Sequence, residues 1–218
     1  MAVVSMSGKI AKSWQVAVAL IAATVFWFFL FSPTVKGVNF WTAMPVFAGV
    51  LAVWGIYCGG LPIHLSHLRL SAIAIGAVSA LMLYMTFYIG NFTAKLMFDF
   101  APGQVGAVYA MKGSNSPVLI ALMLLFVSSP AEEIFWRGFL QKWMMNRWGQ
   151  IAGWLIASLC YAAVHIVSGN FILVMAALIA GLFWGLIYLR LKGNPLPIIL
   201  SHSFWTFGIF IVFPITPP

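Results

Sequence analysis

Residues 117–145 read PVLIALMLLFVSSPAEEIFWRGFLQKWMM, an apolar run that contains two adjacent carboxylates, Glu132 and Glu133. They are two of only three acidic residues among the 218 positions. A spanning helix needs about 20 apolar residues, so this stretch predicts a membrane crossing. Because a charged side chain at bilayer depth costs roughly 2.5–3.5 kcal/mol on insertion scales, the pair also predicts a functional site.

The whole chain has the composition of a membrane protein. Hydrophobic residues make up 63% of it and charged residues 6%. A soluble domain of this length could not cover its surface with so few charges. We therefore expect an all-α fold, a polytopic transmembrane helical bundle in which residues 1–218 form a single domain. The net charge of +8 indicates lipid headgroups rather than nucleic acid as the partner.

Breaker-rich separators divide the chain into about seven predicted spanning helices. Their expected ranges are 14–31, 41–57, 72–89, 117–145, 151–167, 171–191 and 196–213. The first is expected to be a retained helix, because it is longer than the apolar region of a signal peptide and no small-residue cleavage site follows it. In the long connection before Pro117, apolar residues near helical spacing favour a short interfacial helix at about 91–101.

Basic residues between the apolar segments predict the orientation. A cytoplasmic N-terminus puts seven of them inside the cell and three outside, which is the distribution that cytoplasmic loops favour. The inside set is Lys9, Lys12, Arg69, Lys142, Arg147, Arg190 and Lys192, and the outside set is Lys36, Lys95 and Lys112. The expected location is the plasma membrane of a bacterium or an archaeon.

Helical spacing gives the two glutamates different surroundings. Glu133 lies four residues before Arg137, which is the favourable order for an ion pair on one helix. Glu132 has Trp136 at the corresponding position, which would remove water from its carboxyl group. We expect Glu133 to be a fixed anion neutralised by Arg137, and Glu132 to be the titratable group that is free to act as a general base.

Pro130, just before the pair, is expected to kink or restart the helix, because it removes a backbone donor. An alternative role for Glu132 follows from the same stretch. Ser129-Pro130-Ala131-Glu132 has the spacing of a capping box with proline in the first helical turn, and Glu132 would then only cap a helix.

Two histidines lie in other apolar stretches. Each alone is typical of a buried core histidine. A buried acid pair, an arginine and two histidines on three helices, however, need one another for neutralisation. The sequence therefore predicts one buried polar site made of Glu132, Glu133, Arg137, His165 and His202. Residue counting at 1.5 Å per residue puts His165 about 15 Å deeper than Glu132, an offset that tilt, a kink at Pro130 or a later start of the fifth helix would remove.

The motifs resemble those of the CPBP family of intramembrane proteases, which includes the CAAX prenyl endopeptidase and bacterial bacteriocin-processing or immunity proteins. Glu132-Glu133-x-x-x-Arg137 is similar to the first motif of that family. Tyr161-x-x-x-His165 is similar to its second motif, which more often begins with phenylalanine. The resemblance covers a motif-bearing core at about 117–213.

The third motif carries one departure. His202-x-x-x-Thr206 is similar to the family pattern, but family members often have asparagine or aspartate at the position of Thr206. A threonine hydroxyl can still donate one hydrogen bond, so Thr206 is expected to support the site. Losing an oxyanion donor can cost about 2.7–4 kcal/mol, so the departure bears directly on the rate.

The resemblance implies a role for each of the other residues. Glu132 would activate a water molecule, and His165 would help to bind that water. Glu133 and Arg137 would support the site, and His202 would contribute to an oxyanion hole. No cofactor is implied.

Zinc is the alternative, with Glu132, His165 and His202 as its ligands, since a catalytic zinc uses three protein ligands and a water. The absence of a His-Glu-x-x-His spacing and the position of Arg137 beside the acids disfavour it.

The expected function is that of an intramembrane endopeptidase, which hydrolyses a peptide bond of a membrane-associated peptide or protein with a glutamate-activated water. The substrate and the lipid bilayer are the expected partners. One alternative is a non-catalytic bacteriocin-immunity or scaffold protein of the membrane, which the departure at Thr206 favours. Another is an ion-coupled carrier with Glu132 in a proton relay; no inverted repeat supports it.

Overall fold

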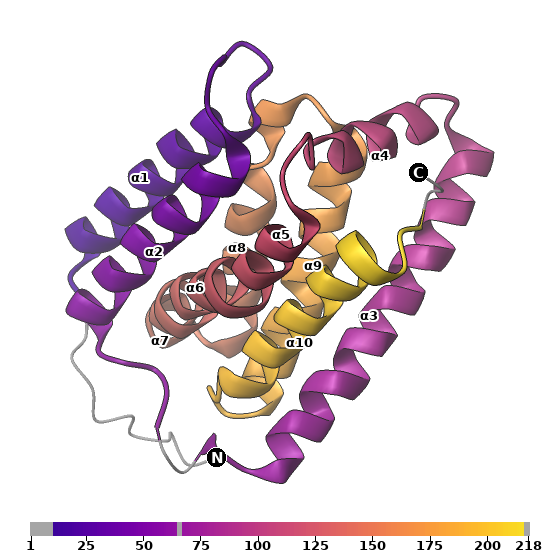
Figure 1. Ribbon diagram of the computed structural model, residues 1–218. Helices are drawn as coiled ribbons and strands as arrows, with labels where there is room; N and C mark the ends of the chain where they lie inside the picture. Colours follow the sequence, from indigo (N-terminus) through magenta and orange to yellow (C-terminus); the bar gives the residue numbers. More distant parts are fainter. Residues whose placement is uncertain (1–10, 65–66, 216–218) are drawn as a thin grey trace.

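The computed structural model describes residues 11–64 and 67–215, and no strand occurs within them (Figure 1). The helices are α1 (Ser13–Phe31), α2 (Phe40–Gly59), α3 (Leu70–Met97), α4 (Ala101–Ala110), α5 (Pro117–Met123), α6 (Ser129–Glu133), α7 (Lys142–Trp148), α8 (Gln150–Ala163), α9 (Phe171–Arg190) and α10 (Leu196–Phe207). Three π-helical segments, η2 (Leu124–Ser128), η3 (Ile134–Gln141) and η5 (Gly208–Val212), and a 3₁₀ turn, η4 (Ile166–Ser168), continue them.

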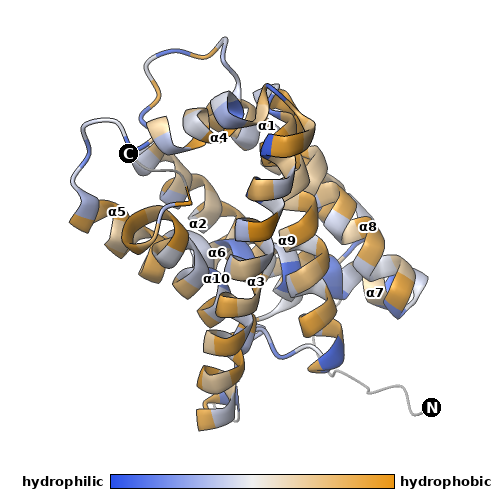
Figure 2. Cartoon of the chain, turned by 90° about the vertical axis from the view of Figure 1, so that its right-hand side faces the viewer, coloured by the Kyte–Doolittle hydropathy of each residue, from blue (hydrophilic) through white to orange (hydrophobic). Residues whose placement is uncertain are grey.

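Six helices among the described residues are long and apolar enough to cross a membrane. They are Ser13–Phe31, Phe40–Gly59, Leu70–Met97, Pro117–Trp148, Gln150–Ser168 and Phe171–Arg190. The predicted seventh, Leu196–Val212, is an apolar helix but a shorter one. The prediction of a helical membrane bundle is confirmed, and the protein is an integral membrane protein. Hydrophobic residues run along the helices, whereas hydrophilic ones gather in the connections and around α6 (Figure 2).

The short helix of the long connection lies later than predicted. Residues 91–97 continue α3 to Met97, and the separate short helix is α4, Ala101–Ala110. Pro102 explains the difference, because it occupies the first turn of α4, where its missing N–H costs nothing and its fixed φ suits a helix. Proline and glycine together usually mark a connection, whereas Ala101-Pro102-Gly103 begins a helix here.

The connections end one helix and begin the next with recognisable residues. Asn39 and Asn170 cap α2 and α9, because their side chains accept hydrogen bonds from the amides of Trp41 and Leu173, each at 2.9 Å. Gly149 separates α7 from α8 with a φ of 87°, a conformation that glycine adopts without steric cost.

The fourth span carries the acid pair on a helix that is continuous from Pro117 to Trp148. Pro130 lies inside this helix, and the predicted restart of the helix does not occur. Instead, the hydrogen bonding changes to the π pattern at η2 and again at η3. The capping alternative is wrong, because Ser128 and Ser129 are themselves helical and no side-chain cap forms. Single-turn π segments often occur at functional sites.

The helices surround the fourth span. α1 packs along α2, α8 along α9, and α10 along α3, while η3 lies against α2 and α8 (Figure 1). Gly138 of η3 allows close approach, because a Cβ there would lie 2.7 Å from Cγ of Pro62. The connection between α1 and α2 lies at the same end of the bundle as α4, and the turn between α9 and α10 lies at the other end (Figure 1). Lys9, used in the orientation argument, lies outside the described residues.

Candidate active site

The five ionisable residues predicted to form one site are all buried, and none is more than 7% exposed. Glu132 and Glu133 end α6, Arg137 lies in η3, His165 follows α8, and His202 lies in α10. Three of them, Glu132, His165 and His202, line a single cavity of about 170 Å³. The three sequence motifs therefore meet in the interior of the bundle.

Glu133 is the charge centre of the cluster. Its Oε1 accepts a hydrogen bond from Nη1 of Arg137 at 2.8 Å and one from Nδ1 of His202 at 2.7 Å. The predicted pairing of Glu133 with Arg137 is thereby confirmed. The Glu133 side chain is fully buried, so its charge is held by these two cationic or donor groups rather than by solvent.

His202 is fixed on two sides. Its ring stacks on Trp184 of α9 with centroids 4.0 Å apart and planes 22° apart. The Trp184 indole is itself held, because its Nε1 donates to Oγ of Ser201 at 3.1 Å. With Nδ1 bonded to Glu133, the Nε2 edge of the His202 ring is the one left for another partner.

Glu132 has a different environment from that of its neighbour. Its Oε2 accepts a hydrogen bond from the hydroxyl of Tyr161 at 3.2 Å, and its side chain lines the cavity. Within the described ranges, Tyr161 is the side chain that donates to Glu132, whereas Glu133 has two donors. The two adjacent acids therefore lie in one helix turn but in separate hydrogen-bond networks.

His165 is bonded at both ring nitrogens. Nδ1 lies 2.8 Å from the carbonyl oxygen of Tyr161, and because a carbonyl only accepts, Nδ1 carries the proton. Nε2 then accepts from Nε1 of Trp27, 3.1 Å away on α1. The ring also makes edge contacts with Trp27 and Tyr161, with centroids 6.0 and 5.3 Å apart.

The cavity is mostly apolar apart from these groups. Apolar side chains from α1, α2, α9 and η5 form much of its wall, among them Phe31, Phe40, Met44, Ala177 and Phe210. One water molecule occupies about 30 Å³ in the liquid, so the cavity can hold several waters or part of a peptide. Carboxylate and imidazole groups thus border a space large enough for several waters within an apolar bundle.

Thr206 directs its proton away from this space. Its hydroxyl donates to the carbonyl oxygen of His202, one helical turn earlier. Its oxygen lies 3.0 Å from Oγ of Ser129, and since its proton is already used, Ser129 is the donor of that bond. In this arrangement Thr206 ties α10 to α6 and offers no donor to the cavity.

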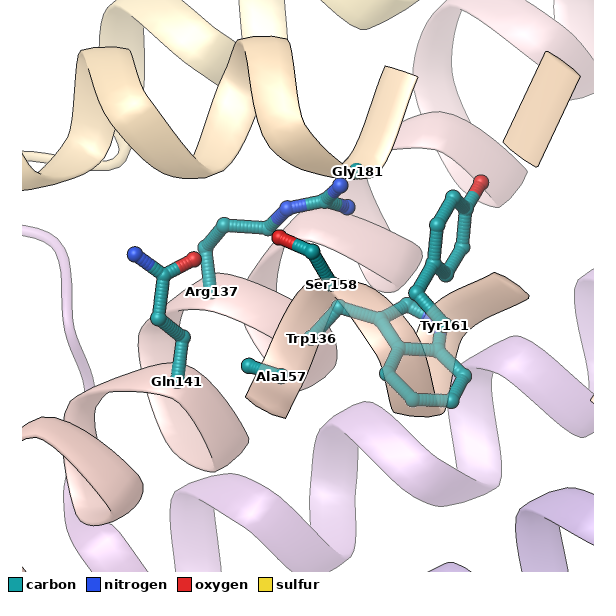
Figure 3. A pocket seen from close by; sticks show the side chains of 7 residues that line it. All are labelled: Trp136, Arg137, Gln141, Ala157, Ser158, Tyr161 and Gly181. Atoms are coloured by element: carbon teal, nitrogen blue, oxygen red, sulfur yellow. The ribbon is translucent and has the colours of Figure 1, made fainter. Parts of the chain in front are cut away.

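The far side of the cluster is closed. Figure 3 shows a small hollow with no room for a water molecule, lined by Trp136, Arg137, Gln141, Ala157, Ser158, Tyr161 and Gly181. The guanidinium carbon of Arg137 lies 4.7 Å above the ring of Tyr161 and 5.4 Å from that of Trp184. These aromatic faces help to stabilise the buried cation, one of whose nitrogens, Nη2, has no hydrogen-bond partner among the described residues.

Comparison with known protein families gave one match. The family model for Rce1-like proteins, described as type II CAAX prenyl endopeptidase Rce1-like, matches residues 114–208. The match, over residues 114–208, supports an assignment to the CPBP/CAAX protease family. Comparisons with curated proteins and with solved structures gave no match.

The Rce1-like segment holds all three motifs, and its family supports an intramembrane protease of the CAAX type. One hydrogen bond to a motif residue comes from outside that segment. Trp27 of α1 is fully buried and bonds His165, a contact that the sequence analysis did not predict. Its only advance signal is that a buried indole N–H needs an acceptor. The second motif contains Tyr161, but its spacing does not predict the hydrogen bond from the Tyr161 hydroxyl to Glu132.

The zinc alternative does not fit this Rce1-like site. No group of three His, Cys, Asp or Glu side chains in the described part of the chain is arranged to hold a metal ion. Glu132, His165 and His202 share the cavity, but both ring nitrogens of His165 are bonded to other groups of the protein. The three side chains are therefore not gathered as a ligand set.

Proposed function

We propose that the protein is an intramembrane endopeptidase that hydrolyses a peptide bond of a membrane-associated peptide or protein, with Glu132 as the general base that activates water. One observation carries the proposal. Glu132 borders a cavity that His165 and His202 also line, whereas the adjacent Glu133 is held by Arg137 and His202. A base must reach the proton that it removes, and Glu132 is the acid that borders free space.

The proposed reaction balances with these residues alone. Glu132 takes a proton from a water molecule in the cavity, and the water oxygen attacks the carbonyl carbon of the scissile bond. The carbonyl oxygen becomes the oxyanion of a tetrahedral intermediate. When that intermediate collapses, the C–N bond breaks, and Glu132 returns its proton to the leaving amine.

His202 is the proposed donor to the oxyanion. Its Nδ1 proton goes to Glu133, so a hydrogen bond from Nε2 to the oxyanion requires that the ring carry both protons. The Glu133 carboxylate lies 2.7 Å from Nδ1, and stacking on Trp184 fixes the direction of the ring. A donor aimed where negative charge develops contributes most in a site that excludes water.

His165 is the proposed second ligand of the water. The nitrogen available for this role is Nε2, because Nδ1 is bonded to the carbonyl of Tyr161. In the resting arrangement Nε2 accepts from Trp27. Water binding at His165 therefore requires the exchange of the Trp27 indole for the water, and α1 becomes part of the catalytic cycle.

The supporting residues complete the proposal. Glu133, which is bonded to Arg137, holds His202. Through its hydrogen bond with Ser129, Thr206 joins α10 to the helix that carries Glu132. The proposed substrate reaches the cavity from the bilayer or its cytoplasmic side, with the N-terminus of the protease in the cytoplasm. Cavity walls rich in aromatic and aliphatic side chains suit a substrate that is itself membrane-associated.

Proteoliposomes test the proposal against its two alternatives. Wild-type protein and the Glu132→Gln variant are each reconstituted with internally quenched CAAX peptides, one farnesylated and one unmodified. Cleavage by the wild type and not by the variant supports the protease. Cleavage by both contradicts the role of Glu132. Proton flux without cleavage supports an ion-coupled carrier, and neither activity supports a scaffold or immunity protein.

A further inference from the structure

Tyr161 bonds both Glu132, the proposed base, and His165, the proposed water ligand. Its hydroxyl donates to Oε2 of Glu132 at 3.2 Å, and its carbonyl oxygen lies 2.8 Å from Nδ1 of His165. It lies near the end of α8, is 6% exposed, and lines the cavity. A single residue thus connects the proposed base to the proposed water ligand.

The Tyr161 ring is held in place by its neighbours rather than by its hydroxyl. Trp136 meets it edge to face with centroids 5.1 Å apart, and the Arg137 guanidinium lies 4.7 Å above it. Cδ1 of the ring would also lie 3.3 Å from a Cβ placed on Gly181, so α9 leaves little room on that side. A phenylalanine would keep these contacts, and only the hydroxyl reaches Glu132.

The hydroxyl decides how Glu132 presents its carboxylate. Holding Oε2 fixes the rotation of the group about its last bond and leaves Oε1 for a water in the cavity. Fixing a reacting group in its productive geometry removes an entropic cost from the reaction. Without this bond, the carboxylate of Glu132 has no donor among the side chains of the described residues to hold it.

We propose that Tyr161 is a positioning residue of this enzyme. Its hydroxyl orients Glu132 so that one carboxylate oxygen can accept the proton of the water. The inference rests on the proposed function and adds Tyr161 to it. The phenylalanine that is common at this position of the second motif has no hydroxyl to supply this bond. Tyr161 acts through Glu132 and does not itself contact the reacting atoms.

The test replaces the hydroxyl and then restores a donor. Tyr161→Phe is compared with the wild type on the farnesylated quenched CAAX peptide in proteoliposomes. We expect kcat to fall roughly tenfold to a hundredfold and KM to change by less than about twofold, since the bond lost is one to a charged group. p-Aminophenylalanine at position 161, which carries an N–H donor at the same place, is expected to recover most of the lost kcat.

Tyr188→Phe is the matched control. Tyr188 is 1% exposed on α9, its hydroxyl has no hydrogen-bond partner among the described residues, and it does not line the cavity. Its removal deletes a buried hydroxyl at equal burial, and kcat is expected to stay at the wild-type value. A fall of kcat in Tyr188→Phe equal to that in Tyr161→Phe would show that loss of any buried hydroxyl slows the enzyme, which overturns the inference.

Two further outcomes decide the matter. A Tyr161→Phe enzyme with wild-type kcat overturns the inference, and so does a p-aminophenylalanine enzyme that is folded but as slow as Tyr161→Phe. If Tyr161→Phe does not fold, the p-aminophenylalanine enzyme alone decides, because it keeps the donor: a kcat within about threefold of wild type supports positioning, and a folded but inactive protein refutes it. Activity of Glu132→Gln in the same assay would instead remove the proposed function.

Discussion

The buried pair of Glu133 and Arg137 gives the sharpest prediction about stability. In Glu133→Gln, the amide oxygen can still accept both hydrogen bonds that Oε1 now accepts, but the charge that neutralises Arg137 is lost. Breaking a buried ion pair by removing one partner costs about 3–5 kcal/mol. Because these hydrogen bonds can survive, we expect a loss at the lower end of that range, about 3 kcal/mol, together with a large fall in kcat as His202 loses its anion.

Adding a second substitution, at Arg137, tests whether the stranded cation causes the loss of stability. Adding Arg137→Gln to Glu133→Gln removes the stranded cation, so the double variant should be more stable than Glu133→Gln alone, by about 1–2 kcal/mol. The measurement is reversible SDS unfolding of the purified protein, followed by tryptophan fluorescence. Arg147→Gln, at an exposed position near the end of α7, is the control and should change stability by less than about 0.5 kcal/mol. A double variant that is no more stable than Glu133→Gln alone would refute the reasoning.

Two other predictions concern α1 and the packing of η3. Trp27→Phe frees Nε2 of His165 for water, so kcat in the proteoliposome assay should rise by up to about tenfold, the worth of one neutral hydrogen bond; a folded variant with lower kcat would contradict the exchange at His165. Gly138→Ala puts a Cβ 2.7 Å from Pro62 and should lower stability by about 1–3 kcal/mol in SDS unfolding. In Gly106→Ala nothing lies within 4 Å of the new Cβ, so stability should be unchanged or up to about 1 kcal/mol higher, and an equal loss in both variants would dismiss the packing argument.

Local features of the chain could be predicted from its sequence. The apolar runs fixed the spanning helices, and the four-residue spacing of Glu133 and Arg137 fixed their contact, because both depend on residues within a few turns of one helix. The short helix α4 was misplaced for a local reason as well, since Pro102 can break a helix or begin one, and only the neighbouring backbone decides.

For contacts between helices, the sequence could predict that the buried polar residues meet, but not which of them bond to one another. Mutual neutralisation of buried charges implied that His202 meets the acid pair, but not that it bonds Glu133 rather than Glu132, 69 or 70 positions away in the chain. The contact of Trp27 with His165 spans 138 positions, and no spacing rule reaches that far.

The predicted depth offset of His165 shows the same limit. The fifth helix begins at Gln150, as expected, so a later start does not explain why His165 reaches the cavity of Glu132. α8 ends at Ala163, two residues before the histidine, and the helices are inclined to one another rather than parallel (Figure 1). A count of 1.5 Å per residue assumes a continuous helix and parallel axes, and neither condition holds here.

The most direct test of the account is the set of new peptide ends that Glu132 creates in a membrane. Wild-type protein and Glu132→Gln are expressed at equal levels in the same host, and mass spectrometry compares the termini of membrane-associated peptides. The account predicts cleavage products that occur with the wild type and are missing with Glu132→Gln, while their uncut precursors accumulate. Identical termini in the two membranes, with both proteins folded, would contradict it.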